Sequence, residues 1–209
     1  GNGDYLSLAD SDDWYFGTDD FTNMFYVNFT ALPSAGNMVR FWSQQKDSSN
    51  NQDFYIYNNA GTYYIYYTVA SSGSNIIVFN RAASLSTNTP YQLVLSRQST
   101  TFRMYLNGSP LGSDYTNAVA VPNFAAPLHI GERASASYIN AYIDEFALWN
   151  SVAIPIADLY PQSYEVGTLL GPIPSFTANI TGGYPPLSVQ FNDTSVTNIT
   201  AWSWTATNI

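Results

Sequence analysis

Polar and apolar residues alternate with a period of two along most of residues 4–149, and this alternation constrains the fold more than any other feature. In residues 21–30, for example, Phe21, Phe25, Val27 and Phe29 share one parity. A period of two places alternate side chains on opposite faces of a strand. Similar segments recur at 4–8, 38–44, 53–57, 62–69, 75–80, 91–97, 102–106, 127–131 and 138–149. About ten short strands without helix-length segments between them predict an antiparallel β-sandwich.

The composition changes after this region and predicts a second domain. Residues 156–165 are compatible with a short helical turn, which Pro161 limits, and residues 167–174 have the Gly and Pro content of a connector. We predict a first domain at 1–167, a linker at 168–174 and a second domain at 175–209. The second domain is too short to bury a stable core alone, so we expect the chain to be a segment of something longer.

Charge and composition exclude several classes of protein. The net charge of −9 argues against binding to nucleic acid and to anionic lipid, both of which require clustered cations. The chain contains no Cys, which excludes disulfides, thiolate metal sites and Cys nucleophiles. No apolar run reaches the 18 residues of a spanning helix, so we expect no membrane insertion in this segment.

Three blocks of sequence, at 3–29, 91–112 and 128–155, occur in the order typical of one family. The closing block contains Ile143, Asp144, Glu145, Phe146 and Trp149, and the middle block places an Asn-Gly turn after a strand. Over residues 3–165 the chain resembles the laminin-G-like, concanavalin-A-like jelly-roll family. The resemblance implies an all-β fold, an antiparallel jelly-roll β-sandwich.

The end of the chain resembles a different family. Residues 176–209 are similar to the first half of a PKD domain, an immunoglobulin-like surface module. The residues that carry this resemblance are Phe176, Gly182, Gly183, Pro186, Leu187, Val189, Phe191, Trp202 and Trp204. The resemblance implies a partial immunoglobulin-like β-sandwich after the jelly roll.

The sequence argues against catalysis. Glucanases of the jelly-roll superfamily use two carboxylates about 5 Å apart, on a Glu-X-Asp-X-X-Glu strand. None of the three Glu, namely Glu132, Glu145 and Glu165, stands in that pattern. Asp144 and Glu145 are neighbours, so we expect their side chains to point to opposite faces. His129 is the single His and stands between two apolar residues, which favours a hydrogen-bonded structural role. We therefore predict that the chain is not an enzyme.

Aspartates cluster before the second strand. Read from Asp10 as an EF-hand loop, the sequence lacks the Gly and Glu that such a loop requires. Relatives in the resembled family hold Ca²⁺ at the sandwich edge, often with an Asp of the closing strand. The resemblance thus implies a structural Ca²⁺ bound by Asp19, Asp20 and Asp144. The alternative is that Asp10 and Asp12 are turn formers and that Asp19 or Asp20 caps a strand end.

Tyrosine is abundant, with 17 residues, and many lie between residues 55 and 67. Tyr64 and Tyr66 share one face of their predicted strand. Exposed aromatic rings beside amides are typical of sugar recognition. The sequence thus predicts a ligand-binding face formed by Arg40, Trp42, Gln44, Tyr64 and Tyr66. The alternatives are that the rings pack between the sheets or form a protein interface.

Asn-X-Ser/Thr sequences favour an extracellular or cell-surface location. They predict glycosylation at Asn28, Asn107, Asn179, Asn192 and Asn198. Asn107 follows a predicted strand at a hairpin tip, where a glycan is most accessible.

These observations predict a non-catalytic extracellular binding or adhesion module of a cell-surface protein that recognises glycan or another cell-surface protein. One alternative is a structural subunit of a surface sheath, filament or virion appendage, in which tyrosine-rich faces serve self-association. Another is an accessory domain of a glycosidase whose catalytic residues lie elsewhere.

Overall fold

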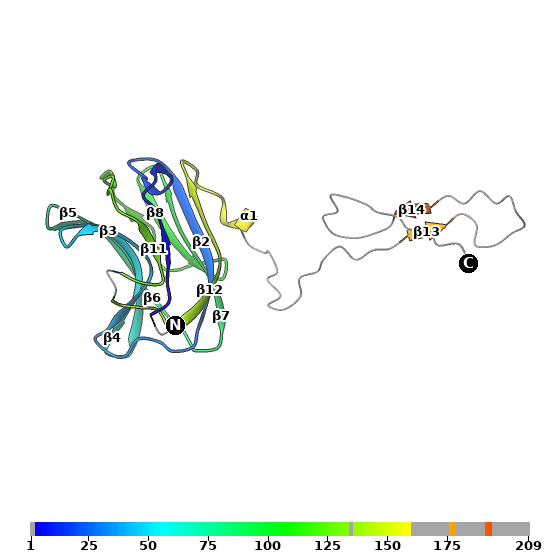
Figure 1. Ribbon diagram of the computed structural model, residues 1–209, viewed down its shortest axis with the longest axis horizontal. Helices are drawn as coiled ribbons and strands as arrows, with labels where there is room; N and C mark the ends of the chain where they lie inside the picture. The colour runs from blue at the N-terminus through cyan, green and yellow to red at the C-terminus, as the bar shows by residue number, and fades with distance from the viewer. Residues whose placement is uncertain (1–2, 134–135, 160–175, 179–190, 194–209) are drawn as a thin grey trace, which may run out of the picture. The chain divides into compact units, whose positions relative to one another are not determined.

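The computed structural model describes residues 3–133, 136–159, 176–178 and 191–193. The chain divides into two units, residues 1–162 and 163–209. In the described part of the first unit, two antiparallel β-sheets face each other and helix is limited to two short turns (Figure 1). The all-β fold with two antiparallel sheets, as in a jelly-roll sandwich, is therefore confirmed.

The first sheet contains six strands in the order β1-β11-β3-β4-β5-β6. The bounds of these strands are β1 Leu6–Leu8, β11 Leu128–Ile130, β3 Met38–Asp47, β4 Asn50–Asn59, β5 Thr62–Ser71 and β6 Ser74–Ala83. Tight turns join β3 to β4, β4 to β5 and β5 to β6, so these four long strands form a meander. The outer face of this sheet carries the candidate site.

The second sheet has the order β10-β8-β7-β2-β12, and β9 pairs with β8. The bounds are β10 Tyr115–Thr116, β8 Thr101–Leu106, β7 Pro90–Gln98, β2 Phe21–Phe29, β12 Ala141–Asn150 and β9 Ser109–Pro110. The two helical turns are η1 Asp12–Trp14 and α1 Ile156–Leu159. In the part of the chain that the structure describes, neither is long and apolar enough to cross a membrane.

Aromatic rings interlock between the two sheets. Phe25 of β2 contacts Phe41 of β3 and Phe54 of β4, at ring-centroid distances of 5.2 and 5.9 Å. Phe21 of β2 contacts Tyr67 of β5 at 6.0 Å. Such tilted and edge-on pairs add to the stabilisation that burial of the rings supplies. The interlocked rings fix one sheet on the other, so the residues that alternate with them are held on the outer faces.

The chain after β12 turns back over the outer face of the second sheet. The hydroxyl of Thr22 donates to the Val152 carbonyl at 3.1 Å and accepts from the Ile154 N–H at 2.9 Å. The side-chain amide of Gln92 donates to the Leu159 carbonyl at 2.8 Å. We call residues 151–159 the strap. It helps to bury β2 on both of its faces.

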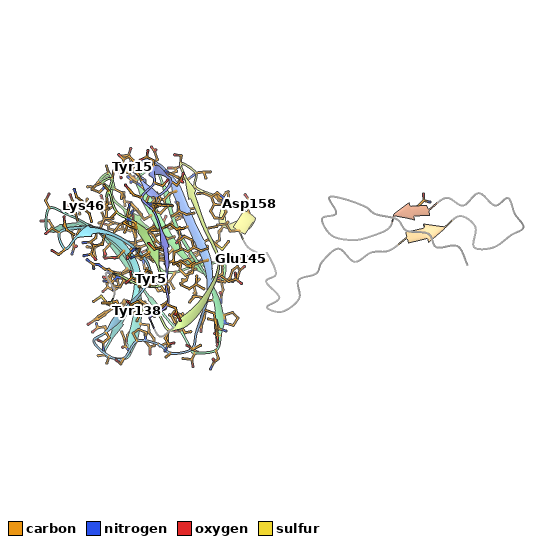
Figure 2. All side chains as sticks on the ribbon, in the orientation of Figure 1. Tyr5, Tyr15, Lys46, Tyr138, Glu145 and Asp158 are labelled. Atoms are coloured by element: carbon orange, nitrogen blue, oxygen red, sulfur yellow. The ribbon has the colours of Figure 1, made fainter. Side chains whose placement is uncertain are left out.

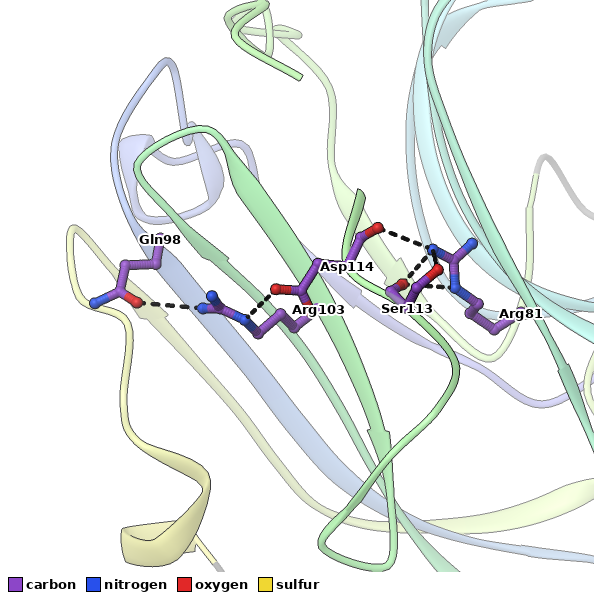
Figure 3. A network of polar contacts seen from close by, with 5 residues as sticks. All are labelled: Arg81, Gln98, Arg103, Ser113 and Asp114. Atoms are coloured by element: carbon purple, nitrogen blue, oxygen red, sulfur yellow. Dashed lines mark hydrogen bonds and ion pairs between the residues drawn. The ribbon is translucent and has the colours of Figure 1, made fainter. Parts of the chain in front are cut away.

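Arg81 of β6 joins the two sheets at one side of the sandwich (Figure 3). Its Nε donates to the Ser113 carbonyl at 2.8 Å, and its Nη2 donates to the Asp114 carbonyl at 3.2 Å. Arg103 of β8 extends the network through a 3.0 Å contact with the Asp114 carboxylate. Gly112 has a φ of +75°, and a Cβ there would collide with the Arg81 side chain. The position therefore requires glycine.

In the second unit, β13 Phe176–Ala178 pairs antiparallel with β14 Phe191–Asp193. The other residues that carry the resemblance to a PKD domain lie outside the described residues, as do those of the predicted linker. The immunoglobulin-like second domain and the predicted domain boundaries therefore stay predictions.

Candidate functional site

Tyrosines from two neighbouring strands gather on the outer face of the first sheet. Tyr55 and Tyr57 of β4 pair in register with Tyr66 and Tyr64 of β5. All four side chains are half-buried, whereas the isoleucines between them are fully buried in the core. The pairing and the alternation together place the four rings side by side on one surface. We call these four residues the tyrosine platform.

The platform contains a stacked column that ends on an arginine. The rings of Tyr55 and Tyr66 lie within 5° of parallel, with centroids 5.0 Å apart. The guanidinium of Arg40, on β3, lies 4.4 Å from the centroid of Tyr55. Because β4 lies between β3 and β5, Arg40 and Tyr66 contact opposite sides of the Tyr55 ring. Tyr57 lies edge-on to Tyr66 at 6.3 Å. Burial raises the pKa of the Tyr55 hydroxyl, so this ring stays neutral at physiological pH. These contacts hold the rings in one arrangement.

A buried charge network adjoins the column. Asp53 of β4 is 2% exposed, and its carboxylate lies 3.5 Å from Nε of Arg40 and 2.9 Å from Nη1 of Arg133. Burial raises the pKa of the Asp53 carboxyl, and the two arginines oppose that rise. Burial likewise lowers the pKa of Arg40, against the attraction of Asp53. The Asp53 carboxylate therefore holds Arg40 beside Tyr55. It also binds Arg133, which lies in the segment after β11, to the outer face of the sheet.

His129 of β11 faces the same side of the sheet and is held by a buried carboxylate. Its Nδ1 contacts Oε1 of Glu132, which is fully buried. The Tyr5 ring packs against the imidazole at 5.3 Å, and Tyr138 lies 6.3 Å from Tyr5 (Figure 2). A quarter of the His129 side chain remains exposed. The His129 ring is thus held in place at the surface, whereas its neighbours Leu128 and Ile130 point into the core.

The structure brings together three of the five predicted ligand-binding residues. Arg40, Tyr64 and Tyr66 lie on the outer face of the first sheet, with Tyr66 stacked on the ring that Arg40 also contacts. The two rings that the sequence prediction omitted are Tyr55 and Tyr57. Across the hairpin, Tyr55 pairs with Tyr66 and Tyr57 pairs with Tyr64, so all four rings lie on one face. The spacing of these tyrosines around the turn is a sequence signal that could have identified them.

Contrary to the prediction, Trp42 and Gln44 do not lie on this face. Trp42 is fully buried and its Nε1 donates to Oδ1 of Asn23 at 2.9 Å. Gln44 is 1% exposed and donates to the Phe124 carbonyl at 2.7 Å. The reason is a β-bulge between Arg40 and Trp42, which shifts the register and turns the later residues of β3 to the other face.

Asp19, Asp20 and Asp144 do not fit a single calcium site. Asp20 directly precedes β2, and its carboxylate accepts the Ser99 N–H at 2.6 Å. Asp144 pairs with Tyr26, six residues further along β2, which is a separation of about 20 Å. Among the described residues, no group of three or more His, Asp and Glu is close enough to hold a metal ion.

Calcium binding itself stays a prediction of the resemblance, and thermal unfolding tests it. If Asp20 or Asp144 helps to bind Ca²⁺ in the folded state alone, a hundredfold excess of the ion over its Kd should stabilise the fold by about 2.7 kcal/mol. The melting temperature should then rise, and EDTA should reverse the rise. Identical melting curves with Ca²⁺ and with EDTA would leave these aspartates a role in turns and at strand ends, as in the bond from the Ser99 N–H to the Asp20 carboxylate.

Asp144 and Glu145 do not point to opposite faces as expected. A β-bulge lies between Asp144 and Ala147, and Glu145 has a φ of +50°. Both residues are exposed and line one groove of about 570 Å³, together with Leu6 of β1 and the exposed Tyr142. A Glu-X-Asp-X-X-Glu strand is still missing from the sequence, so the absence of catalysis stays a prediction.

The predicted glycosylation sites differ in exposure. Asn107 is exposed at the tip between β8 and β9, although its Oδ1 accepts the Gln92 N–H at 2.8 Å. Asn192 is exposed on β14. Asn28 is half-buried on β2, which lies between β7 and β12 in the second sheet, and this position leaves little room for a glycan. Asn179 and Asn198 lie outside the described residues.

Comparisons with known proteins agree with this architecture. A family model described as the concanavalin A-like lectin/glucanases superfamily matches residues 1–154. A search of curated protein sequences found no match. The structural similarities below are all under 25% in sequence identity, so they bear on the fold alone.

One similar structure is domain 4 of AbnA, a GH43 extracellular arabinanase from Geobacillus stearothermophilus, in complex with arabinotriose. It has a TM-score of 0.56 and 16% identity, covering 74% of this chain and 71% of that one. A second is the CBM40 of Ruminococcus gnavus IT-sialidase bound to α2,3-sialyllactose, with a TM-score of 0.52 and 11% identity over 68% of this chain and 82% of the other.

A third similar structure is botulinum neurotoxin type C, whose cell entry depends on interaction with two ganglioside molecules. It has a TM-score of 0.55 and 12% identity, covering 74% of this chain. The matched region spans 38% of that toxin structure.

Proposed function

The chain belongs to the concanavalin A-like lectin/glucanases superfamily, and from this premise we propose that it is a non-catalytic module that binds glycans. The proposed site is the outer face of the first sheet, with the tyrosine platform at its centre. Similar folds occur in domains bound to arabinotriose and to sialyllactose, which supports a carbohydrate as the ligand.

The observation that carries the proposal is the stacked column of Arg40, Tyr55 and Tyr66. Sugar rings present apolar C–H faces and polar hydroxyls, which aromatic rings with polar edges complement. Arg40 and Tyr66 cover the two faces of Tyr55, so Tyr55 offers its edge and hydroxyl, and the other rings of the platform complete the surface. Because the column already fixes the rings, binding a glycan requires little further ordering of side chains. The buried Asp53 network supports the column from the side, so the rings have a firm base.

We place this module on the outside of a cell, where it contacts glycans of a surface or matrix. The support is indirect: the chain contains several glycosylation sequences, and charged residues make up 10% of it. Neutral polar groups therefore cover most of its surface.

The proposal is tested by a glycan array followed by calorimetry on the best ligand. We expect Tyr66→Ala to weaken binding about tenfold, because it removes the central ring of the platform. Tyr105→Ala is the matched control, since Tyr105 is also half-buried but lies on β8 of the other sheet. Equal affinity of the Tyr66→Ala variant and the unchanged protein, or no ligand on the array, would refute the proposed site.

A specific observation also favours the alternative of self-association. Leu6 of β1 and Tyr142 of β12, which are 65% and 72% exposed, flank the groove between the edge strands of the two sheets. Light scattering over a range of concentrations would show this association as a rise in mass, and Tyr142→Ser should lower it.

A further inference from the structure

A pocket adjoins the proposed glycan face at the far end of β3. It has a volume of about 260 Å³ and is lined by Gln45, Lys46, Asp47, Pro127 and His129. Gln45 pairs with Asn51 of β4, six residues from Tyr57 of the platform, so about 20 Å of sheet separates the two ends of the face.

Hydrogen-bond donors converge on this pocket. Lys46 is exposed, and its ammonium has no ion-pair partner among the described residues. Oε1 of Gln45 accepts the Arg133 Nε–H at 3.0 Å. The side-chain amide nitrogen of Gln45 has no acceptor among the described residues, so it remains a free donor. Both side chains can turn their donors to a bound group without breaking a contact that the structure shows.

His129 supplies a third polar group, and its orientation is fixed. The contact of Nδ1 with the buried Glu132 carboxylate and the packing of Tyr5 hold the ring. Nε2 is then the nitrogen that remains for a ligand, as in the carboxylate-held histidines of binding sites generally.

The acid in the lining is already occupied. Asp47 accepts the Ser49 N–H at 2.8 Å and the Asn50 side-chain amide at 2.9 Å. These hydrogen bonds lower the pKa of the Asp47 carboxyl, the bond from Ser49 most of all. The Asp47 oxygens are therefore engaged in the turn between β3 and β4. The charge of Lys46 also contributes to the lowered pKa of Asp47, but the two side chains form no ion pair in the described part of the chain.

We propose that this pocket binds the acidic group of a glycan, a carboxylate or a sulfate, whose uncharged rings lie along the tyrosine platform. The inference rests on the proposed function and specifies its ligand class. Three of the six Lys and Arg, namely Arg40, Lys46 and Arg133, belong to this face in a chain of net charge −9. The same face also carries the carboxylates of Asp47, Asp53 and Glu132, and Asp53 already pairs with Arg40 and Arg133. Among the described residues, Lys46 is therefore the cation of this face that remains for an acidic group.

The test uses pairs of oligosaccharides that differ in charge alone. Oligogalacturonate and its methyl ester form one pair, and a sulfated glycan and its desulfated form are the other. Calorimetry should show the acidic member binding about tenfold more tightly, with the advantage shrinking as salt is added. The pair that shows the larger advantage identifies carboxylate or sulfate as the group recognised.

Lys46→Gln should remove most of that advantage while leaving the affinity for the neutral member unchanged. Arg103→Gln is the control, because Arg103 is a partly exposed cation on the other sheet. Lys46 is exposed, so its replacement leaves the fold intact, and circular dichroism verifies this.

The outcomes separate the two proposals. Equal affinities within both pairs, with binding still sensitive to Tyr66→Ala, would overturn the acidic-ligand inference and keep the glycan site. An acidic preference that Lys46→Gln leaves unchanged would overturn the assignment to this pocket. Absence of binding for every member, on the array as well, would overturn the proposed function itself.

Discussion

Replacing Asp53 with alanine is expected to lower the free energy of unfolding by about 3–5 kcal/mol. The carboxylate is 2% exposed and faces both Arg40 and Arg133. Arg40 is itself 4% exposed, so the variant leaves a cation in the interior without its counter-charge. Domains of this kind have a total stability of about 5–15 kcal/mol, so the loss is a large part of it.

Urea unfolding, followed by tryptophan fluorescence, measures this loss. The matched control is Asp114→Ala, which removes a carboxylate that is 53% exposed and paired with Arg103. Exposed pairs of this type contribute about 0–1 kcal/mol. In the double variant Arg40→Met with Asp53→Ala, we expect much of the stability to return, because neither charge remains buried. A loss below about 1 kcal/mol for Asp53→Ala would mean that the network is solvated and does not support the column.

Replacing Trp42 with alanine is expected to cost a similar amount, about 3–5 kcal/mol. The ring is fully buried, lies 6.2 Å from Phe54 and 6.0 Å from Tyr67, and donates to Asn23 at 2.9 Å. The variant therefore leaves a cavity and also an amide oxygen without its donor.

The same unfolding experiment measures the effect, with Trp149→Ala as the control. Trp149 is half-buried on the edge strand β12, so its loss should be clearly smaller. The variant Trp42→Phe distinguishes a packing role for Trp42 in the core from the ligand-binding role that the sequence predicts. It should lower stability but leave glycan affinity unchanged, whereas a specific loss of affinity at full stability would return Trp42 to the binding site.

Most of the fold could be predicted from the sequence because alternation is a local signal. Each long strand, such as residues 62–71, shows its apolar face within its own residues. Turn sequences such as Asn107-Gly108, both with positive φ, mark the hairpins in the same local way. Strand existence and fold class therefore follow from short windows.

The site could be predicted in part, because the face of a residue depends on register. Tyr64 and Tyr66 lie in an uninterrupted stretch of β5, and parity places them correctly. Arg40 and Trp42 share a parity, yet one extra residue between them sends them to opposite faces. Asp144 and Glu145 show the converse effect. As neighbours they are expected on opposite faces, but the bulge after Asp144 places both of them in one groove.

Partners that are distant in sequence could not be predicted. Asp53 and Arg133 are 80 positions apart, and β11 with the segment after it brings them together. The sequence predicts a hydrogen-bonded structural role for His129, and its contact with Glu132 agrees with that role, but the sequence does not show which partner holds the ring. The strand of His129 is paired on both sides, so Leu128 and Ile130 face the core and the histidine faces outward. No local pattern reports which strands lie next to β11.

The strap has a mechanical consequence for a module that is held by the chain beyond residue 159. Tension applied there loads the Gln92–Leu159 contact first and then the bonds of Thr22 to Val152 and Ile154. These contacts can break one after another at low force, and nine extended residues supply about 30 Å of slack. The eight residue pairs between β12 and β2 bear load after that slack is used. We therefore expect the strap to detach under small loads before the sheets do, and the face that we propose for glycan binding lies on the opposite sheet.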